Sequence, residues 1–168
     1  MKLTWFGGST LRIHIGGRIL VAEPAALTGV DADELVSGAD QVFALDGLSP
    51  VDAVHWQPRR QTTMLDESGP SEVHVHGLAA RSVLVDAVGE PPLLLLGEPL
   101  HGAGRWSRDA VVVAFAADVA AAALDTLEPR LIALAMAETQ ADAVFGQLRN
   151  RLGGTAVVAL EPRMALEI

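Results

Sequence analysis

Residues 1–24 have the sequence MKLTWFGGSTLRIHIGGRILVAEP, which predicts three short strands joined by two glycine turns. In the second strand, aliphatic residues alternate with Arg12 and His14, as expected for a strand with one buried face. Gly16-Gly17 can adopt the positive φ angles of a tight hairpin turn, and Pro24 ends the ladder because it has no backbone N–H. The predicted strands are Leu3–Phe6, Leu11–Ile15 and Arg18–Ala22.

The rest of the chain predicts short strands first and two longer helices late. A brief helix is predicted from Asp31 to Val36, where Asp31 and Glu34 form a capping box. Residues 57–71 and 98–108 have the composition of loops. The further predicted strands are Ala39–Leu45, Ala53–Trp56, Glu72–His76, Ser82–Ala87, Pro92–Leu96, Val111–Phe115, Arg130–Ala135, Thr155–Leu160 and Met164–Ile168. This pattern predicts an α/β fold of the α+β kind: one domain, residues 1–168, in which two sheets form a sandwich with helices outside.

The two late helices show the clearest periodicity. Asp118 is predicted to cap an alanine-rich helix that ends at Glu128-Pro129, and Thr139 to cap the last helix. Gly153-Gly154 is predicted to end that helix as a C-cap pair. The apolar face of the last helix repeats at helical spacing and is predicted to pack on a sheet. Its residues are Ala141, Val144, Phe145, Leu148 and Leu152.

Composition limits the classes of function. Half of the 168 residues are hydrophobic, but the apolar runs are far shorter than the ~20 residues of a membrane span. The net charge of −9 argues against a nucleic-acid partner, because such proteins carry a basic surface that faces phosphates. There is no cysteine, and the N-terminal residues lack the zones of a signal peptide. We therefore expect a cytoplasmic protein without a nucleic-acid or membrane partner.

The opening segment resembles the start of the metallo-β-lactamase-fold hydrolases, and most closely their L-ascorbate lactonase-like branch. That branch begins with a strand, Gly-His-Ser, a second strand, a Gly-Gly hairpin and a third strand that ends in Asp-Pro. This chain has the same spacing through Trp5-Phe6-Gly7-Gly8, Gly16-Gly17 and Glu23-Pro24. The resemblance implies a truncated αββα four-layer sandwich, and it implies that the family's chemistry was metal-dependent hydrolysis.

The resemblance also implies that the metal ligands are lost. The family's first histidine falls at Gly8 and its Asp before Pro at Glu23. Asp118 alone stands where a bridging aspartate is expected, and Glu161–Arg163 lacks the final histidine. The His-x-His-x-Asp-His motif would fall at Asp46, Leu48, Pro50 and Val51.

A hydrolytic metal site needs at least three protein ligands and an open position for water. Without the histidines, the resemblance implies a pseudoenzyme with no catalytic residue, no metal and no cofactor. Leu48 or Val51 is then predicted to fill the former site and to contact the Gly7-Gly8 turn, with no ion between that turn and Asp118.

Two alternative interpretations give the protein a catalytic site. His74 and His76 lie two residues apart on a predicted strand, so both rings face one side and could bind one metal ion, with His101 as a third ligand. The competing interpretation is a solvated histidine face with the neighbouring valines turned inward. In the second alternative, Glu23 and Asp46 lie together and do acid–base work.

The remaining features indicate association more than a ligand. Trp56 and Trp106 flank polar loops, where packing is favoured over a small-molecule pocket. Met164, Leu166 and Ile168 share one face of a predicted edge strand, and such a strand invites pairing. We therefore predict a homodimer or a larger closed oligomer, with any small-molecule ligand unidentified.

Overall fold

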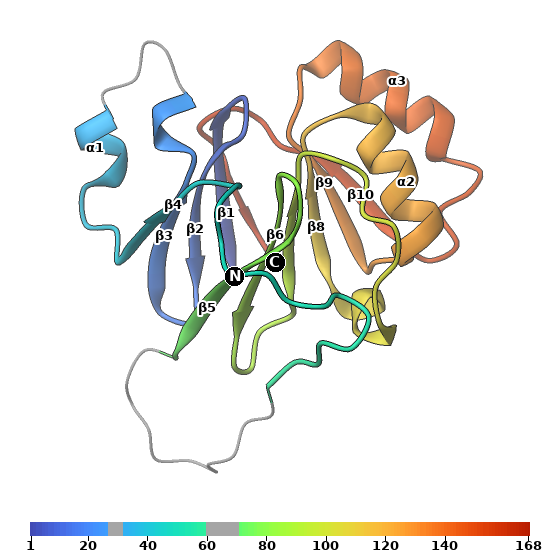
Figure 1. The fold of residues 1–168 in the computed structure, drawn as a ribbon. Coiled ribbons are helices and arrows are strands. Elements are labelled where there is room, and N and C mark those ends of the chain that lie inside the picture. Colours follow the sequence, from blue (N-terminus) through green and yellow to red (C-terminus); the bar gives the residue numbers. More distant parts are fainter. Residues whose placement is uncertain (27–31, 60–70) are drawn as a thin grey trace.

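A computed structural model describes residues 1–26, 32–59 and 71–168. The described chain forms two mixed β-sheets and three α-helices. Figure 1 shows the layers in order: α1, the sheet that contains β1, the sheet that contains β8, and then α2 with α3. The predicted sandwich of two mixed sheets with helices outside is therefore confirmed.

The first sheet, sheet A, has the strand order β11-β1-β2-β3-β4. Its core is the predicted double hairpin, in which Leu3 pairs with Ile13 and Ile13 with Leu20. Gly16 and Gly17 both have positive φ angles, at 57° and 76°, as the hairpin turn requires. The strands are β1 (Lys2–Gly7), β2 (Thr10–Ile15), β3 (Arg18–Ala22), β4 (Gln41–Phe43) and β11 (Ala165–Glu167).

The second sheet, sheet B, has the order β10-β9-β8-β7-β6-β5, and β7 to β10 run parallel. The central strands β7 and β8 are buried on both faces, which explains their unbroken apolar sequences. The strands are β5 (Val73–Ala79), β6 (Ser82–Ala87), β7 (Leu93–Leu96), β8 (Val111–Ala114), β9 (Leu131–Leu134) and β10 (Ala156–Ala159).

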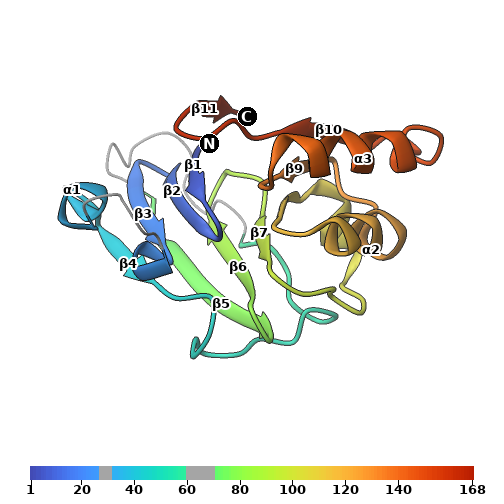
Figure 2. The ribbon, with the colours of Figure 1, turned by 90° about the horizontal axis from the view of Figure 1, so that it is seen from above.

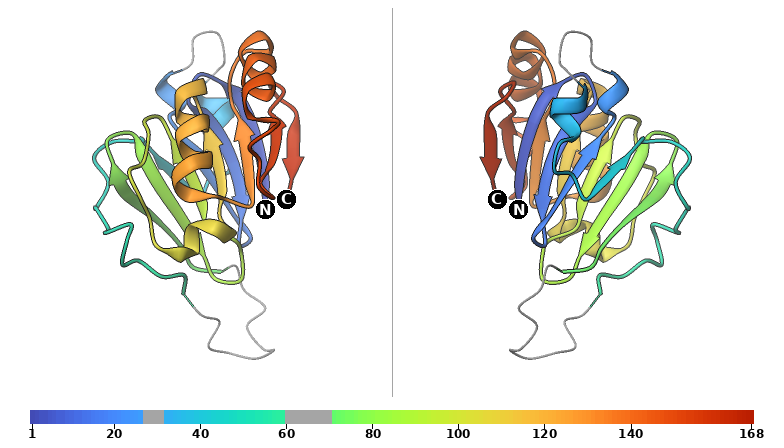
Figure 3. Two further views of the ribbon diagram at one scale, coloured as in Figure 1. Left: turned by 90° about the vertical axis from the view of Figure 1, so that its right-hand side faces the viewer. Right: turned by 90° about the vertical axis from the view of Figure 1, so that its left-hand side faces the viewer.

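Helices cover the outer faces unequally. The long helices α2 (Ala117–Leu127) and α3 (Glu138–Leu148) cover sheet B, as the side views in Figure 3 show. Among the described residues, the only α-helix on sheet A is the five-residue α1 (Ala32–Val36). Arg12 holds α1 on sheet A by donating to the carbonyl oxygens of Leu35 and Ser37, at 2.7 and 3.0 Å. Two 3-10 helices, η1 (Pro24–Ala26) and η2 (Arg105–Asp109), complete the elements.

The sandwich has two cores. The inter-sheet core lies between the two sheets, and the helix-side core lies between sheet B and the helices. Ala141, Val144 and Leu148 are buried in the helix-side core, and Phe145 packs against it, so the predicted apolar face of the last helix is confirmed. No helix of the described residues is both long enough and apolar enough to cross a membrane.

Three predicted helix boundaries are wrong. The N-caps are Ala116 and Ala137, without a side-chain hydrogen bond, so Asp118 and Thr139 lie inside the first turns. The last helix ends at Leu148 because the next three residues are exposed and no packing sustains further turns. Gly153-Gly154 instead forms the turn before β10, with positive φ at both residues.

Ala53–Trp56 was predicted as a strand, and this prediction is also wrong. The segment is a turn, because the Asp52 carboxylate accepts a hydrogen bond from the Val54 amide at 2.9 Å and the Trp56 amide donates to the Asp52 carbonyl at 2.8 Å. Aspartate side chains commonly fix the backbone in this way. The alternation of residues alone did not indicate this local competition.

Candidate functional site

The positions implied by the family resemblance lie mostly on or beside one irregular segment, residues 44–59. This segment leaves sheet A after β4 and passes along β5 to the outer face of sheet B (Figure 1). A single parallel bridge joins Pro50 to Gly77: the Gly77 amide donates to the Ser49 carbonyl at 3.0 Å, and the Val51 amide donates to the Gly77 carbonyl at 2.9 Å. The segment thus contacts sheet B at the β5 edge through one isolated bridge.

Glu23 holds the start of the 44–59 segment to the end of β3. It is half-buried and has a left-handed backbone, with φ of 49°. Its Oε1 accepts a hydrogen bond from the Leu45 amide at 2.8 Å, and its own amide donates to the Phe43 carbonyl at 2.9 Å. The Thr10 hydroxyl donates to the Glu23 carbonyl at 2.6 Å. The carboxylate therefore serves as an acceptor for backbone.

Asp46, the residue after Leu45, also accepts a hydrogen bond from a backbone amide. Its exposed carboxylate accepts a hydrogen bond from the Arg81 amide at 3.0 Å, across the turn that joins β5 to β6. Arg81 also has a left-handed backbone, with φ of 48°. Glu23 and Asp46 therefore each bond a backbone amide, and the described contacts include no bond between the two carboxylates that would suggest acid–base work.

The two apolar side chains at the motif positions implied by the resemblance, Leu48 and Val51, pack against different cores. Leu48 packs against the inter-sheet core, and Val51 packs against the helix-side core. Leu48 lies over Gly77, where an added Cβ would be 3.2 Å from the Leu48 carbonyl oxygen. A Cβ added at Gly8 would meet nothing within 4 Å in the described part of the chain, so the structure gives no support to the predicted contact between the Gly7-Gly8 turn and Leu48 or Val51.

Asp118 lies exposed in the first turn of α2. The start of α2 and the turn between β1 and β2 lie at the same end of the sandwich (Figure 1). No hydrogen bond or ion pair of the Asp118 side chain occurs among the described residues. Of Glu23, Asp46 and Asp118, the three carboxylates at positions implied by the resemblance, Asp118 is thus the one that does not bond backbone among the described residues.

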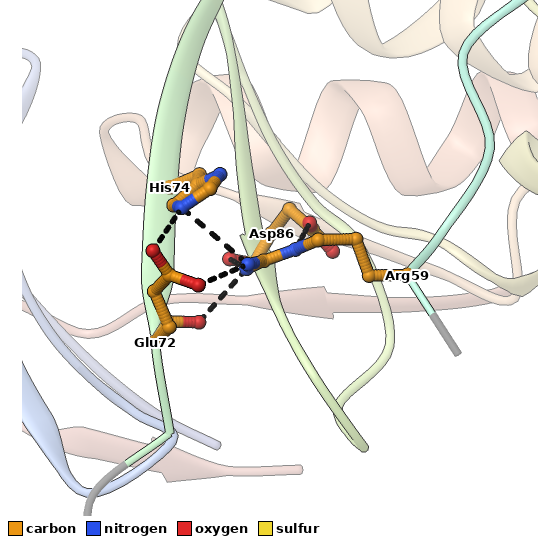
Figure 4. Close-up of polar contacts among 4 residues, drawn as sticks. All are labelled: Arg59, Glu72, His74 and Asp86. Carbon is orange, nitrogen blue, oxygen red and sulfur yellow. Dashed lines mark hydrogen bonds and ion pairs between the residues drawn. The ribbon is translucent and has the colours of Figure 1, made fainter. Parts of the chain in front are cut away.

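A cluster of opposite charges holds the other end of the 44–59 segment (Figure 4). Nε of Arg59 donates to the carboxylate of Asp86 at 2.7 Å, and Nη1 donates to the carboxylate of Glu72 at 3.0 Å. The Asp86 side chain is only 4% exposed, whereas that of Glu72 is 73% exposed. Nη2 of Arg59 also donates to the carbonyl oxygens of Glu72 and Asp86, at 2.8 and 3.3 Å. Arg59, Glu72 and Asp86 thus each have an oppositely charged partner.

His74 and His76 border this cluster on the outer face of β5. Nε2 of His74 lies 2.8 Å from the Glu72 carboxylate, and the hydrogen bond with His74 is the main reason that the pKa of Glu72 is lowered. The ring of His76 meets that of His74 edge-on, with 5.7 Å between centroids. Partial burial, followed by the nearby His74, lowers the pKa of His76. Val73 and Val75 pack against the inter-sheet core, so the predicted inward valines are confirmed.

This arrangement does not provide a set of metal ligands. The described residues contain no group of three or more His, Cys, Asp or Glu side chains that could hold a metal ion, so His101 does not complete a set with His74 and His76. The Arg59 guanidinium also lies 3.4 Å from Nε2 of His74. A positive charge at that distance opposes the binding of a cation at the same nitrogen.

The two tryptophans have a packing role. Trp56 and Trp106 meet edge to face with 4.7 Å between ring centroids, and Nε1 of Trp106 donates to the Ala53 carbonyl at 2.8 Å. An added Cβ at Gly104 would lie 2.7 Å from the Val54 carbonyl oxygen, so only glycine allows this approach. These contacts fix the middle of the 44–59 segment on η2.

Sequence reasoning missed Arg59 and Asp86. The available signal was an acid in the otherwise apolar strand SVLVDA, because a buried charge requires a partner. Comparisons with protein-family models, with curated proteins and with solved structures give no match to this chain. A functional conclusion therefore depends on the residues themselves.

Proposed function

We propose that this chain is a non-catalytic, truncated member of the metallo-β-lactamase fold that acts by binding or self-association. One observation carries the proposal: the carboxylates of Glu23 and Asp46, which stand at family site positions, bond the amides of Leu45 and Arg81. Side chains that hold backbone in this way support the fold, and they are not free for chemistry.

The layered architecture supports the family assignment. Two mixed sheets pack face to face, the long helices cover one outer face, and the chain begins with the glycine-linked hairpins that carry the resemblance. A cytoplasmic location belongs to the same proposal, because a chain without cysteine does not need an oxidising compartment.

The side chains present do not suit a catalytic metal. Gly8, Leu48 and Val51 offer no ligand atom, and Pro50 has no N–H or polar side chain. Glu23, Asp46 and Asp118 remain, and two of these are already hydrogen-bonded. Carboxylates alone favour hard cations such as Mg²⁺ and bind zinc less well than imidazole does.

A metal-dependent hydrolase with its site moved to His74 and His76 is the second candidate. The observation that favours it is that the two side chains lie on the same outer face of β5, with 5.7 Å between their ring centroids. Arg59 and Glu72 already occupy the polar surroundings of His74, and this supports the non-catalytic proposal over the hydrolase.

The metal content of protein purified without added ions tests the proposal. We expect far less than one equivalent of zinc, manganese or iron per chain. One bound equivalent that survives dialysis would overturn the non-catalytic proposal. If that metal were lost in His74→Ala and His76→Ala, the second candidate would replace the first.

A further inference from the structure

Strand β10 has an unpaired outer edge. It is the end strand of sheet B and pairs only with β9 among the described residues, as the view in Figure 2 shows. The amides of Ala156 and Leu160 point inward and donate to the carbonyls of Arg130 and Leu134, at 3.0 and 2.9 Å. Because successive amides of a strand alternate in direction, those of Val157 and Ala159 point away from the sheet.

The sequence of β10 does not protect this edge. Ala156–Ala159 has no charge, no proline and no bulge, which are the usual features that prevent edge pairing. Val157 and Val158 are only half-buried, one at the rim of each core. A second strand on this edge would complete the hydrogen bonding and cover both side chains.

A groove rich in arginine lies at the start of β10. Its volume is about 580 Å³, and its floor includes Leu124 and Thr155. Three arginines stand around it, of which Arg108 pairs with Glu128 and Arg151 with Asp125. Arg130 has no ion-pair partner in the described chain. The groove therefore has one more positive charge than negative charge.

We propose that β10 pairs antiparallel with β10 of a second copy, so that Glu161 of each copy enters the arginine groove of the other. The proposal rests on the proposed self-association and specifies its surface. The outward amides fix the register: Val157 lies opposite Ala159 of the second copy, and Val158 lies opposite Val158. This register pairs the outward N–H and C=O groups of both strands in four hydrogen bonds.

The same register explains the charge complementarity. Continuing the pairing by two residues puts Glu161 of the second copy opposite Thr155. Thr155 in turn neighbours Arg130, because Ala156 pairs with Leu131. The three residues then form one row on the helix side of the sheet, where directly paired residues face the same way. Glu161 is exposed, and its side chain has no described partner within its own copy.

The contact can form only between copies. Within one chain, Glu161 lies six residues beyond Thr155 along an extended segment, or about 20 Å away. A glutamate side chain does not span that distance. The two-fold pairing is closed, since each copy uses the same edge, and it therefore gives a dimer and not a fibre.

The test is light scattering during gel filtration of the full chain, followed by sedimentation equilibrium. We expect the wild type to have twice the chain mass of 17.6 kDa. Val157→Pro removes an N–H that faces away from β9, so the monomer loses no ladder hydrogen bond while the dimer loses two. We expect this variant to raise the dimer Kd by at least about tenfold.

Charge reversal gives a second test that does not depend on a proline. Arg130→Glu and Glu161→Arg each break both reciprocal contacts, and each is expected to raise the Kd by roughly three- to tenfold. An equimolar mixture of these two variants should regain the wild-type Kd, because both contacts then join opposite charges. Glu98→Arg, on an exposed loop residue far along the chain, is the matched control and should not change the Kd.

The outcomes separate the two proposals. A dimer whose Kd is insensitive to all three variants would overturn the β10 surface but leave self-association intact. A wild-type chain that is monomeric at micromolar concentration would overturn both the surface and the association. Neither result bears on the loss of metal chemistry, which the metal content tests independently.

Discussion

The two ends of the 44–59 segment are both attached by charged side chains, but in different ways. At its start, the carboxylates of Glu23 and Asp46 accept hydrogen bonds from backbone amides near the surface. At its end, Arg59 pairs with the nearly buried Asp86 and with the exposed Glu72. Each contact at the start thus joins one charged side chain to a neutral amide, and water can reach it. The contact between Arg59 and Asp86 joins two opposite charges, and Asp86 is shielded from water.

This difference predicts how much each residue contributes to stability. A hydrogen bond donated by a backbone amide to a carboxylate that is at least partly exposed is worth about 1 kcal/mol, because water can replace the lost partner. Removing one member of a buried pair leaves the other charge without compensation and costs about 3–5 kcal/mol. Both ends support the proposal that the chain is non-catalytic, because their charged side chains bond the backbone or one another.

The largest effect is expected for Asp86→Ala. The Arg59 guanidinium would lose its buried partner, and we expect the free energy of unfolding to fall by about 3 kcal/mol, at the low end because Arg59 remains 28% exposed. Urea denaturation followed by circular dichroism measures this change. Asp86→Asn keeps a hydrogen-bond acceptor and should lose less. A loss below about 1 kcal/mol in Asp86→Ala would contradict the contrast between the two ends.

A smaller effect is expected for Glu23→Ala, at the start of the segment. The Leu45 amide would lose its acceptor, which lowers the free energy of unfolding by about 1–2 kcal/mol in the same urea experiment. Glu23→Gln retains an acceptor oxygen and removes the charge, so it should remain close to the wild type. If Gln were as damaging as Ala, the negative charge and not the hydrogen bond would be what matters at this position.

Asp46→Ala should be milder again. Its bond to the Arg81 amide is exposed, so we expect a loss of about 0.5 kcal/mol, with Asp46→Asn as the matched variant that keeps an acceptor. A loss in Asp46→Ala larger than that in Glu23→Ala would reverse the order that exposure predicts at this end.

The sequence predicted the fold where local chemistry and burial agree. The glycine turns define the hairpins of sheet A, and the unbroken apolar sequences of β7 and β8 indicate strands that are buried on both faces. It did not predict the turn at Ala53–Trp56, where the side chain of Asp52 competes with a strand. The Arg59–Asp86 pair joins residues 27 apart in the chain, and the predicted loop gave no indication of which arginine would reach Asp86.

The pH dependence of stability should be a smaller effect than these substitutions, and His76 at the second end contributes to it. Burial and the neighbouring His74 lower the pKa of His76 below the usual 6.5, and Arg59 acts in the same direction while Asp86 opposes it. The unfolded chain therefore binds this proton at a higher pH than the folded chain does, and stability falls as the pH drops from about 7.5 to about 5.5. The lowered pKa of Glu72 acts only below that window, where its contribution is lost on protonation.

Thermal unfolding at these two pH values checks this prediction. In His76→Gln the decrease in Tm between them should be smaller than in the wild type. His14 has its pKa lowered in the same direction and accounts for part of the decrease that remains. His101→Gln, at an exposed position, is the control and should show the wild-type decrease. If the decrease in Tm were unchanged in His76→Gln, the surroundings of His76 would not be lowering its pKa.

The zinc dependence of the melting temperature tests most directly the proposal that the residues at the implied metal-site positions hold the backbone and do not bind a metal. A ligand that binds the folded state raises Tm, so a fold without a site is unaffected. We predict no rise in Tm on addition of zinc, and no difference in this respect between the wild type and Asp118→Ala. A rise of several degrees that is abolished by Asp118→Ala would contradict the account, and a rise abolished by His74→Ala or His76→Ala would favour the relocated hydrolase.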